Sequence, residues 1–260
     1  MTYRECSLGS VLGLAALLIA AFIVTSVEPR ALGRESLVRE LIDENGKPNV
    51  ITPEELGLLM EKGTAESVLP DIPMDQKVEA VSSIEHLMGL YEKWKVEGRL
   101  NAEGCTTSIG FYHKPSFILG PTEVTLSMRE LVQRAEVVVV AEVVEAQPGI
   151  VGGTTGTLVH FSVVRDLKTS GIPAGTEWNY RSLEYHFEVG GKLLCCQRDG
   201  FYREQPGDLV LLVGRLTQYP ELIHPFGVFA IRDGEVLPQP YEFMITTQPV
   251  LLSDIEAAIK

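Results

Sequence analysis

The hydrophobic pattern divides the chain into an apolar start, a helical stretch and a strand-rich remainder. Residues 8–27, LGSVLGLAALLIAAFIVTSV, carry no charge over about 20 positions, the length that crosses a bilayer as a helix. Val24-Thr25-Ser26 is typical of a signal-peptidase site. We therefore expect residues 1–27 to be a signal peptide cleaved after Ser26 or a retained membrane anchor. Both alternatives export the rest of the chain.

Residues 28–104 show the apolar spacing of helices interrupted by prolines. ESLVRELIDENG has one apolar stripe, and DQKVEAVSSIEHLMGLYEKWKVEG has a longer one. Between them, TPEELGLLMEKG offers Thr52 as N-cap, Pro53 at the first helical position and Glu55 three residues after the cap. This arrangement is a capping box. We predict a helical, proline-interrupted arm over residues 28–104.

From residue 105 onward the pattern changes to strands. SMRELVQRAE predicts a short helix, followed by the β-branched runs VVVVAEVVEAQPG and GTLVHFSVVRDLKTSG. About six antiparallel strands joined by glycine turns indicate a small Greek-key barrel, and LSDIEAAIK predicts a closing helix capped by Ser253. The predicted fold class is α+β: an N-terminal signal or anchor helix, a helical region, and an OB-like antiparallel barrel over residues 105–260 with a short C-terminal helix.

A two-residue turn at Gly190-Gly191 sets a hairpin register. Val189 then lies opposite Lys192, His186 opposite Cys195, and Tyr185 opposite Cys196. Glu184, His186 and Cys195 share one strand face, and imidazole, thiolate and carboxylate are ligands of zinc. These three residues are a candidate zinc or copper site; the alternative is a polar outer face. We expect no other cofactor.

Three cysteines follow the apolar start, so an exported chain should hold one disulfide and one remaining thiol. Neighbouring residues of a strand face opposite sides. Cys196 shares its face with the apolar Tyr185 and Phe187. We therefore predict a disulfide between Cys105 and Cys196, closing a loop of about 90 residues.

Charge and motifs exclude several functions. A formal net charge of −13 disfavours binding to nucleic acid and to anionic membrane surfaces. No serine lies in a nucleophile elbow, and His160, in mid-strand, is typical of a half-buried cross-strand partner. An enzyme would need a site assembled in space from histidines and serines: His113, His160, His186, His224, Ser108, Ser116 and Ser162.

Aromatic residues leave two alternatives open for the strands. OB barrels use aromatic faces to bind oligomers, and the chain offers Trp178, Tyr180, Tyr185 and Phe187. Packing inside the fold is the other interpretation of the same residues. If these aromatics bind, the net charge of −13 favours a glycan or peptide over nucleic acid.

The segments RAEVVVVAEVV, VHFSVVRDLKTSGIPAGT, PGDLVLLVGRL and GVFAIRDGEV, with the final LSDIEAAIK, resemble exported bacterial relatives of the netrin-module or metalloproteinase-inhibitor type of OB barrel. The resemblance covers residues 105–260 and implies a fold and an exported location. In the animal inhibitors an N-terminal cysteine reaches the protease metal. Here Cys105 lies far inside the chain, so that mechanism does not transfer.

Together these observations predict an exported, non-enzymatic binding module of the cell envelope, secreted, periplasmic or tethered outside the cytoplasmic membrane through residues 8–27. Its partner would be an envelope protein or glycan. The alternative is an exported metal-binding protein or hydrolase.

Overall fold

The computed structural model describes residues 41, 49–107, 126–197, 202–239 and 248–259, all in one compact unit spanning Glu40–Lys260. The predicted signal or anchor segment lies outside these residues, and so does nearly all of the helix predicted in ESLVRELIDENG. Among the described helices, none combines the length and the apolar character that a membrane span requires. The described chain is a mixed α+β protein with antiparallel sheets and a short C-terminal helix, which confirms that part of the predicted fold class.

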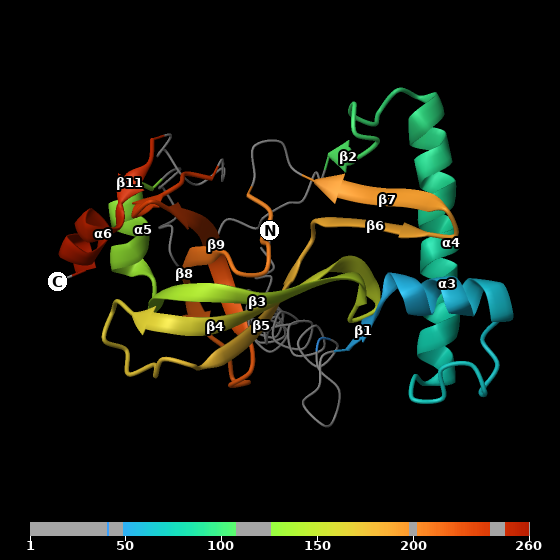
Figure 1. Ribbon diagram of the computed structural model, residues 1–260, viewed down its shortest axis with the longest axis horizontal. Helices are drawn as coiled ribbons and strands as arrows, with labels where there is room; N and C mark the ends of the chain where they lie inside the picture. Colours follow the sequence, from blue (N-terminus) through green and yellow to red (C-terminus); the bar gives the residue numbers. More distant parts are fainter. Residues whose placement is uncertain (1–40, 42–48, 108–125, 198–201, 240–247, 260) are drawn as a thin grey trace, which may run out of the picture. The chain divides into compact units, whose positions relative to one another are not determined.

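The larger sheet has eight strands in the order β11-β10-β9-β8-β3-β4-β5, with β1 paired to β3 (Figure 1). All of its paired neighbours run antiparallel. The strands are β1 (Val50–Ile51), β3 (Val137–Val151), β4 (Thr154–Asp166), β5 (Glu177–Ser182), β8 (Leu209–Leu216), β9 (Ile223–Arg232), β10 (Glu235–Val236) and β11 (Val250–Leu251).

This sheet does not close into the predicted barrel among the described residues. β5 meets the chain just before β9 through one parallel bridge, between Asn179 and Leu222. There the Asn179 N–H donates to the Glu221 carbonyl over 2.8 Å. A single bridge leaves most of β5 and β9 unpaired with each other, so a contact replaces the continuous ladder that a closed barrel needs.

The apolar run of β3 is explained by burial on both faces. Val137 and Val139 point into a core shared with β4, β5, β8 and β9. Val138, on the other face, joins a core covered by α5 (Met128–Arg134) and α6 (Leu252–Ile259). α6 begins at Leu252, so Ser253 lies inside the helix instead of capping it.

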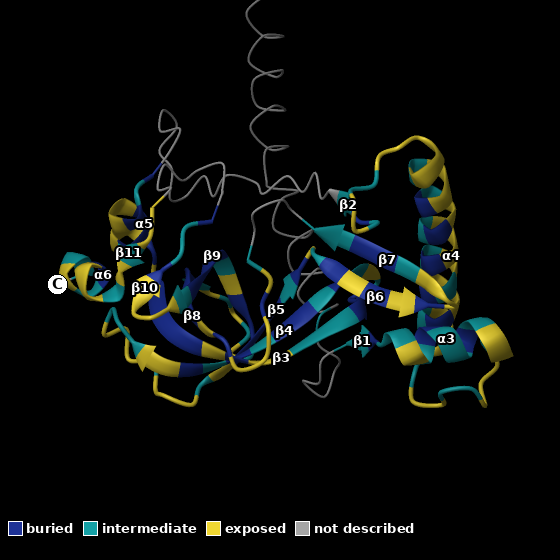
Figure 2. Cartoon of the chain, turned by 45° about the horizontal axis from the view of Figure 1, so that its top comes forward, coloured by how far each residue is buried: buried dark blue, intermediate teal, exposed yellow. Residues whose placement is uncertain are grey.

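A second sheet, in the order β2-β7-β6, supports the region around the cysteines. It consists of β2 (Thr106–Thr107), β6 (Tyr185–Val189) and β7 (Lys192–Gln197). The helices α3 (Pro53–Lys62) and α4 (Met74–Val96) share a hydrophobic core with β6, β7 and Ile150 of β3, and α4 turns its buried stripe to this core (Figure 2). The helices of the predicted arm therefore pack on strands from the predicted barrel domain.

Two local predictions are confirmed in this region. Thr52 and Glu55 form the capping box that begins α3, with both reciprocal hydrogen bonds present. β6 and β7 pair in the predicted register, with Val189 opposite Lys192, His186 opposite Cys195 and Tyr185 opposite Cys196. Gly190 and Gly191 both adopt positive φ, at 57° and 70°, as a two-residue hairpin turn requires.

Tyr91 connects α4 to β7 through buried hydrogen bonds. Its hydroxyl donates to the Cys195 carbonyl and accepts from the Cys195 N–H over 2.8 Å. Burial raises the pKa of Tyr91, so the phenol stays protonated and keeps its donor. Replacing it would leave two buried backbone groups of Cys195 without this partner.

We expect Tyr91→Phe to lower the free energy of unfolding by about 1–3 kcal/mol, the desolvation penalty of an unpaired buried group. Urea denaturation measures this loss. Tyr219→Phe is the matched control, because the Tyr219 hydroxyl makes no hydrogen bond within the described part of the chain. Equal losses in the two variants would contradict the role of the Tyr91 hydroxyl.

Candidate functional site

The disulfide joins Cys105 to Cys195, with the two Cα atoms 4.6 Å apart. Cys196, the predicted partner, is not part of this disulfide, so the predicted Cys105–Cys196 pairing is wrong. The cause is the position of β2. β2 runs parallel to β7 with Thr106 next to Cys196, which places the preceding Cys105 beside Cys195 and on its face. Cys196 instead lies half-buried against the helix-covered core.

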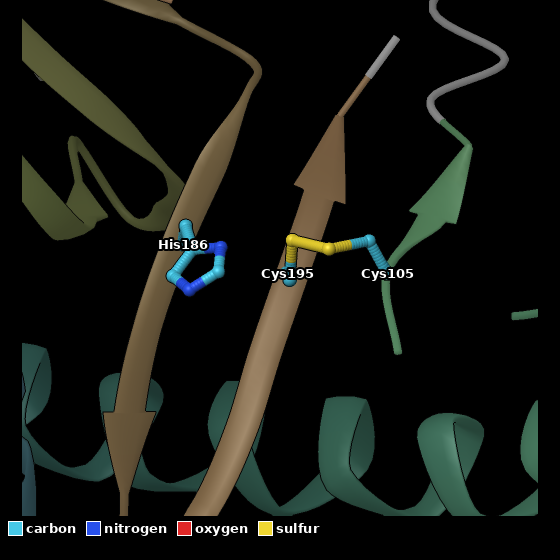
Figure 3. A group of neighbouring side chains, drawn as sticks. All are labelled: Cys105, His186 and Cys195. Carbon is cyan, nitrogen blue, oxygen red and sulfur yellow. A yellow bond between two sulfur atoms is a disulfide. The ribbon is translucent and has the colours of Figure 1, made fainter. Parts of the chain in front are cut away.

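His186 lies beside this disulfide on the sheet face turned away from α4 (Figure 3). The Sγ atoms of Cys105 and Cys195 and a ring nitrogen of His186 all lie within 4.8 Å of one another. Of the three candidate metal ligands, His186 and Cys195 are thus brought together, whereas the carboxylate of Glu184 is not part of this group. The third member of the group is Cys105, and the sequence did not indicate its position there.

A groove of about 510 Å³ lies next to the disulfide, between the second half of α4, the loop 98–104 and β7. Its apolar lining includes Met88, Leu100 and Leu193. Three glycines at its rim, Gly98, Gly104 and Gly191, have no side chains that would narrow it. The groove therefore leaves room for another chain to approach the backbone of β7.

Leu193 turns its backbone toward the groove. Because Val189 and Lys192 close a two-residue turn, they form a hydrogen-bonded pair, and the next pair, Glu188 with Leu193, does not. The N–H and C=O of Leu193 consequently point away from β6. The same alternation turns the Cys195 backbone outward, where Tyr91 binds it. Among the described residues, β2 pairs with β7 only at Cys196 and Gln197, so Leu193 lies on a strand edge that no described strand covers.

Charged side chains give the groove an excess of positive charge. Lys192 Nζ lies 2.9 Å from Glu92 Oε1, and this hydrogen bond lowers the pKa of the Glu92 carboxyl. Lys95 is the second lysine among the lining residues, against the single acidic residue Glu92. In a chain with a formal net charge of −13, this small positive area favours an acidic group on a ligand.

A separate polar cluster lies at the edge of the larger core. Tyr180 donates to the buried Glu204 carboxyl, and burial raises the pKa of Glu204. Tyr202 donates to Asp208, whose other oxygen lies 2.8 Å from Arg232 Nη2. These groups satisfy one another and fix the segment before β8, so the cluster is structural.

The four aromatic candidates for a binding face are buried in the two cores, with exposed fractions between 2% and 9%. Trp178 and Tyr180 belong to the core of the larger sheet, and Tyr185 and Phe187 to the core beneath α3 and α4. Tyr180 also stacks on Phe161 with ring centroids 5.5 Å apart. Packing, the second of the two alternatives, therefore explains these residues.

The histidines and serines named as hydrolytic candidates are distributed differently. His160 lies opposite Asn179 as a cross-strand partner, and its Nε2 is 3.7 Å from Glu177 Oε2, without a hydrogen-bond partner among the described residues. His224 contacts the ring of Phe226. His113, Ser108 and Ser116 lie outside the described residues. The described residues therefore favour no hydrolytic mechanism.

Comparison with protein-family models, curated proteins and solved structures finds no match for this chain. The function must therefore be argued from the geometry of the groove and of the cysteine–histidine group, because fold alone does not fix function.

Proposed function

We propose that this chain is an exported, non-enzymatic binding module of the cell envelope, and that its groove takes an extended polypeptide segment. The observation that carries the proposal is the open edge of β7 at Leu193, whose N–H and C=O face the groove. An extended peptide satisfies both groups by adding a strand, which is a recurring mode of peptide recognition.

The groove lining supports an extended peptide over other ligands. The glycine rim allows backbone to approach backbone, while Met88 and Leu100 offer apolar contacts for alternate side chains. Lys95 favours an acidic residue on the peptide. The partner we infer is therefore an envelope protein with an extended segment that alternates apolar and acidic residues.

Two further features support the exported, OB-like part of the proposal. A disulfide is typical of oxidising compartments outside the cytoplasm, and residues 8–27 supply the export or anchor signal. In the larger sheet, β3, β4 and β5 follow one another, β8 pairs with β3, and Leu222, just before β9, bridges β5 in parallel. This order supports an OB-like Greek-key arrangement in which the last contact is short.

The test is selection of displayed random peptides on the full-length protein, followed by titration of a selected synthetic peptide. We expect Lys95→Glu to weaken its binding about tenfold or more, which corresponds to about 1.4 kcal/mol. Lys93→Glu is the matched control, since Lys93 lies on the same helix, outside the groove lining, and is exposed. It should leave the affinity within about twofold.

Amide hydrogen exchange locates the bound peptide. The Leu193 N–H should exchange more slowly when the peptide adds as a strand to β7. The proposal fails if no peptide is selected, if Lys95→Glu and Lys93→Glu behave alike, or if the Leu193 amide is unaffected. Binding of a soluble glycan in place of peptides, measured by the same titration, would also overturn it.

A further inference from the structure

We propose that reduction of the Cys105–Cys195 disulfide converts this part of the sheet into a Zn²⁺ site formed by Cys105, Cys195 and His186. The proposal is independent of the peptide groove, because none of its three ligands lines that groove. It rests on the 4.8 Å grouping of two sulfur atoms and one imidazole nitrogen (Figure 3).

Strand pairing, and not only the disulfide, holds these side chains together. His186 lies directly opposite Cys195 in the β6–β7 ladder. Cys105 immediately precedes Thr106, which pairs with Cys196 in the β2–β7 ladder. Tyr91 additionally fixes the backbone of Cys195 to α4. Opening the sulfur–sulfur bond leaves all of these contacts in place, so the reduced ligand set is organised before a metal arrives.

A phosphine or dithiol reductant gives two electrons to the disulfide, the sulfur–sulfur bond breaks, and each sulfur takes up one proton. The phosphine becomes its oxide with an oxygen from water, or the dithiol becomes a disulfide. Zn²⁺ then binds both sulfurs as thiolates, releasing those two protons. No electron is transferred in the metal-binding step.

The donor set suits zinc. Thiolate and imidazole are its preferred ligands, at about 2.3 Å for sulfur and about 2.0 Å for nitrogen. A tetrahedral ion at those lengths places its ligand atoms roughly 3.5–4 Å apart. The His186 nitrogen therefore needs only a small movement, and the sulfur atoms separate once they are no longer bonded. Three protein ligands leave a fourth position for solvent.

Disulfide and zinc exclude each other, because a disulfide sulfur has no thiolate to offer. The group is therefore either a covalent crosslink or a metal site, according to its redox state. Mass action requires that zinc binding oppose reoxidation of the pair. Cys196, on the other face of β7, takes no part in either state.

The experiment titrates the full-length protein, reduced with a phosphine under argon, with Co²⁺ as a spectroscopic probe and then with Zn²⁺ as competitor. Thiol counting by mass spectrometry establishes reduction. We expect one equivalent of Co²⁺ with sulfur-to-cobalt charge-transfer absorption, displaced by one equivalent of Zn²⁺. The oxidised protein should show no such absorption.

Two variants assign the ligands. His186→Ala should weaken Co²⁺ binding at least about tenfold, the loss that removal of even an outer-shell partner causes. Cys196→Ser should bind as the unaltered protein does, because it changes the neighbouring thiol alone. Absence of the charge-transfer band, unchanged affinity in His186→Ala, or loss of binding in Cys196→Ser would each overturn the proposal.

Circular dichroism of the same samples covers the case in which the reduced chain unfolds. Zn²⁺ should then restore the folded signal in the unaltered protein and in Cys196→Ser, but not in His186→Ala, because binding to the folded state stabilises it. A reduced chain that stays unfolded in the presence of Zn²⁺ would also overturn the proposal. Neither result depends on whether peptides bind the groove.

Discussion

Cys105→Ser should lower the free energy of unfolding by about 4–5 kcal/mol. The disulfide joins residues 90 positions apart, and in the chain-entropy model a loop of this length restricts the unfolded chain by that amount. Both sulfurs are fully buried and the strands around them are paired, so the serine should cause little additional rearrangement. The loss is a large part of the 5–15 kcal/mol that stabilises an ordinary domain.

Urea denaturation of the oxidised proteins measures this effect. Cys195→Ser should match Cys105→Ser, and the double variant should lose no more than either single variant, because all three lack the same bond. Cys196→Ser is the matched control and should cost less than about 1 kcal/mol. A large loss in Cys196→Ser with a small one in Cys195→Ser would show that Cys105 is bonded to Cys196 after all.

Phe161→Ala should cost about 3–5 kcal/mol, the range for truncating a fully buried phenylalanine. Phe161 has no exposed surface and lies in the core between β3, β4, β5 and β8. Its ring stacks on Tyr180 at an interplanar angle of 6°, and Tyr180 in turn donates to Glu204. The cavity left by alanine would thus border both the apolar core and a buried hydrogen bond.

Val164→Ala provides the control on the same strand. Val164 lies at a register shift of the β3–β4 ladder and is 47% exposed, so its truncation should cost less than about 0.5 kcal/mol. Urea denaturation of the two variants tests the orientation of β4 directly. If Val164→Ala were the more damaging change, the assignment of inward and outward positions on β4 would be reversed.

The parts of this fold that the sequence predicts well depend on residues that lie close together along the chain. The Gly190-Gly191 turn allows the register of β6 and β7 to be predicted residue by residue, because a two-residue loop permits one pairing. The capping box at Thr52 likewise depends on positions three residues apart. In β4, alternation likewise separates the buried Phe161 and Val163 from the half-buried His160 and Ser162.

The disulfide partner was mispredicted because it depends on a long-range pairing. Alternation correctly places Cys195 and Cys196 on opposite faces, but it does not say from which side Cys105 approaches. That side is set by β2, a strand of two residues with no recognisable pattern. The same limitation applies to the groove, which unites α4, the loop 98–104 and β7 from positions about a hundred residues apart.

The barrel prediction overstated closure for a related reason. Composition and turns indicate antiparallel strands. Whether the strands that would close the barrel pair with each other depends on their length and on their position in space. β5 has six residues and meets the chain just before β9 at one bridge. Buried polar groups such as Glu204 were also missed, since a single glutamate beside a proline-containing turn has no signature in sequence.

The long β3–β4 hairpin couples the unfolding of two hydrophobic cores. β3 is fifteen residues long and contributes Val137, Val139, Ala141 and Val143 to the core of the larger sheet. Near its end, Ile150 belongs to the core beneath α3 and α4. One strand is therefore shared by these two hydrophobic cores. Unfolding of either core removes the packing of one end of the hairpin and exposes the hydrogen bonds of its ladder. We therefore expect the two cores to unfold together as a single cooperative unit, without a partly folded intermediate.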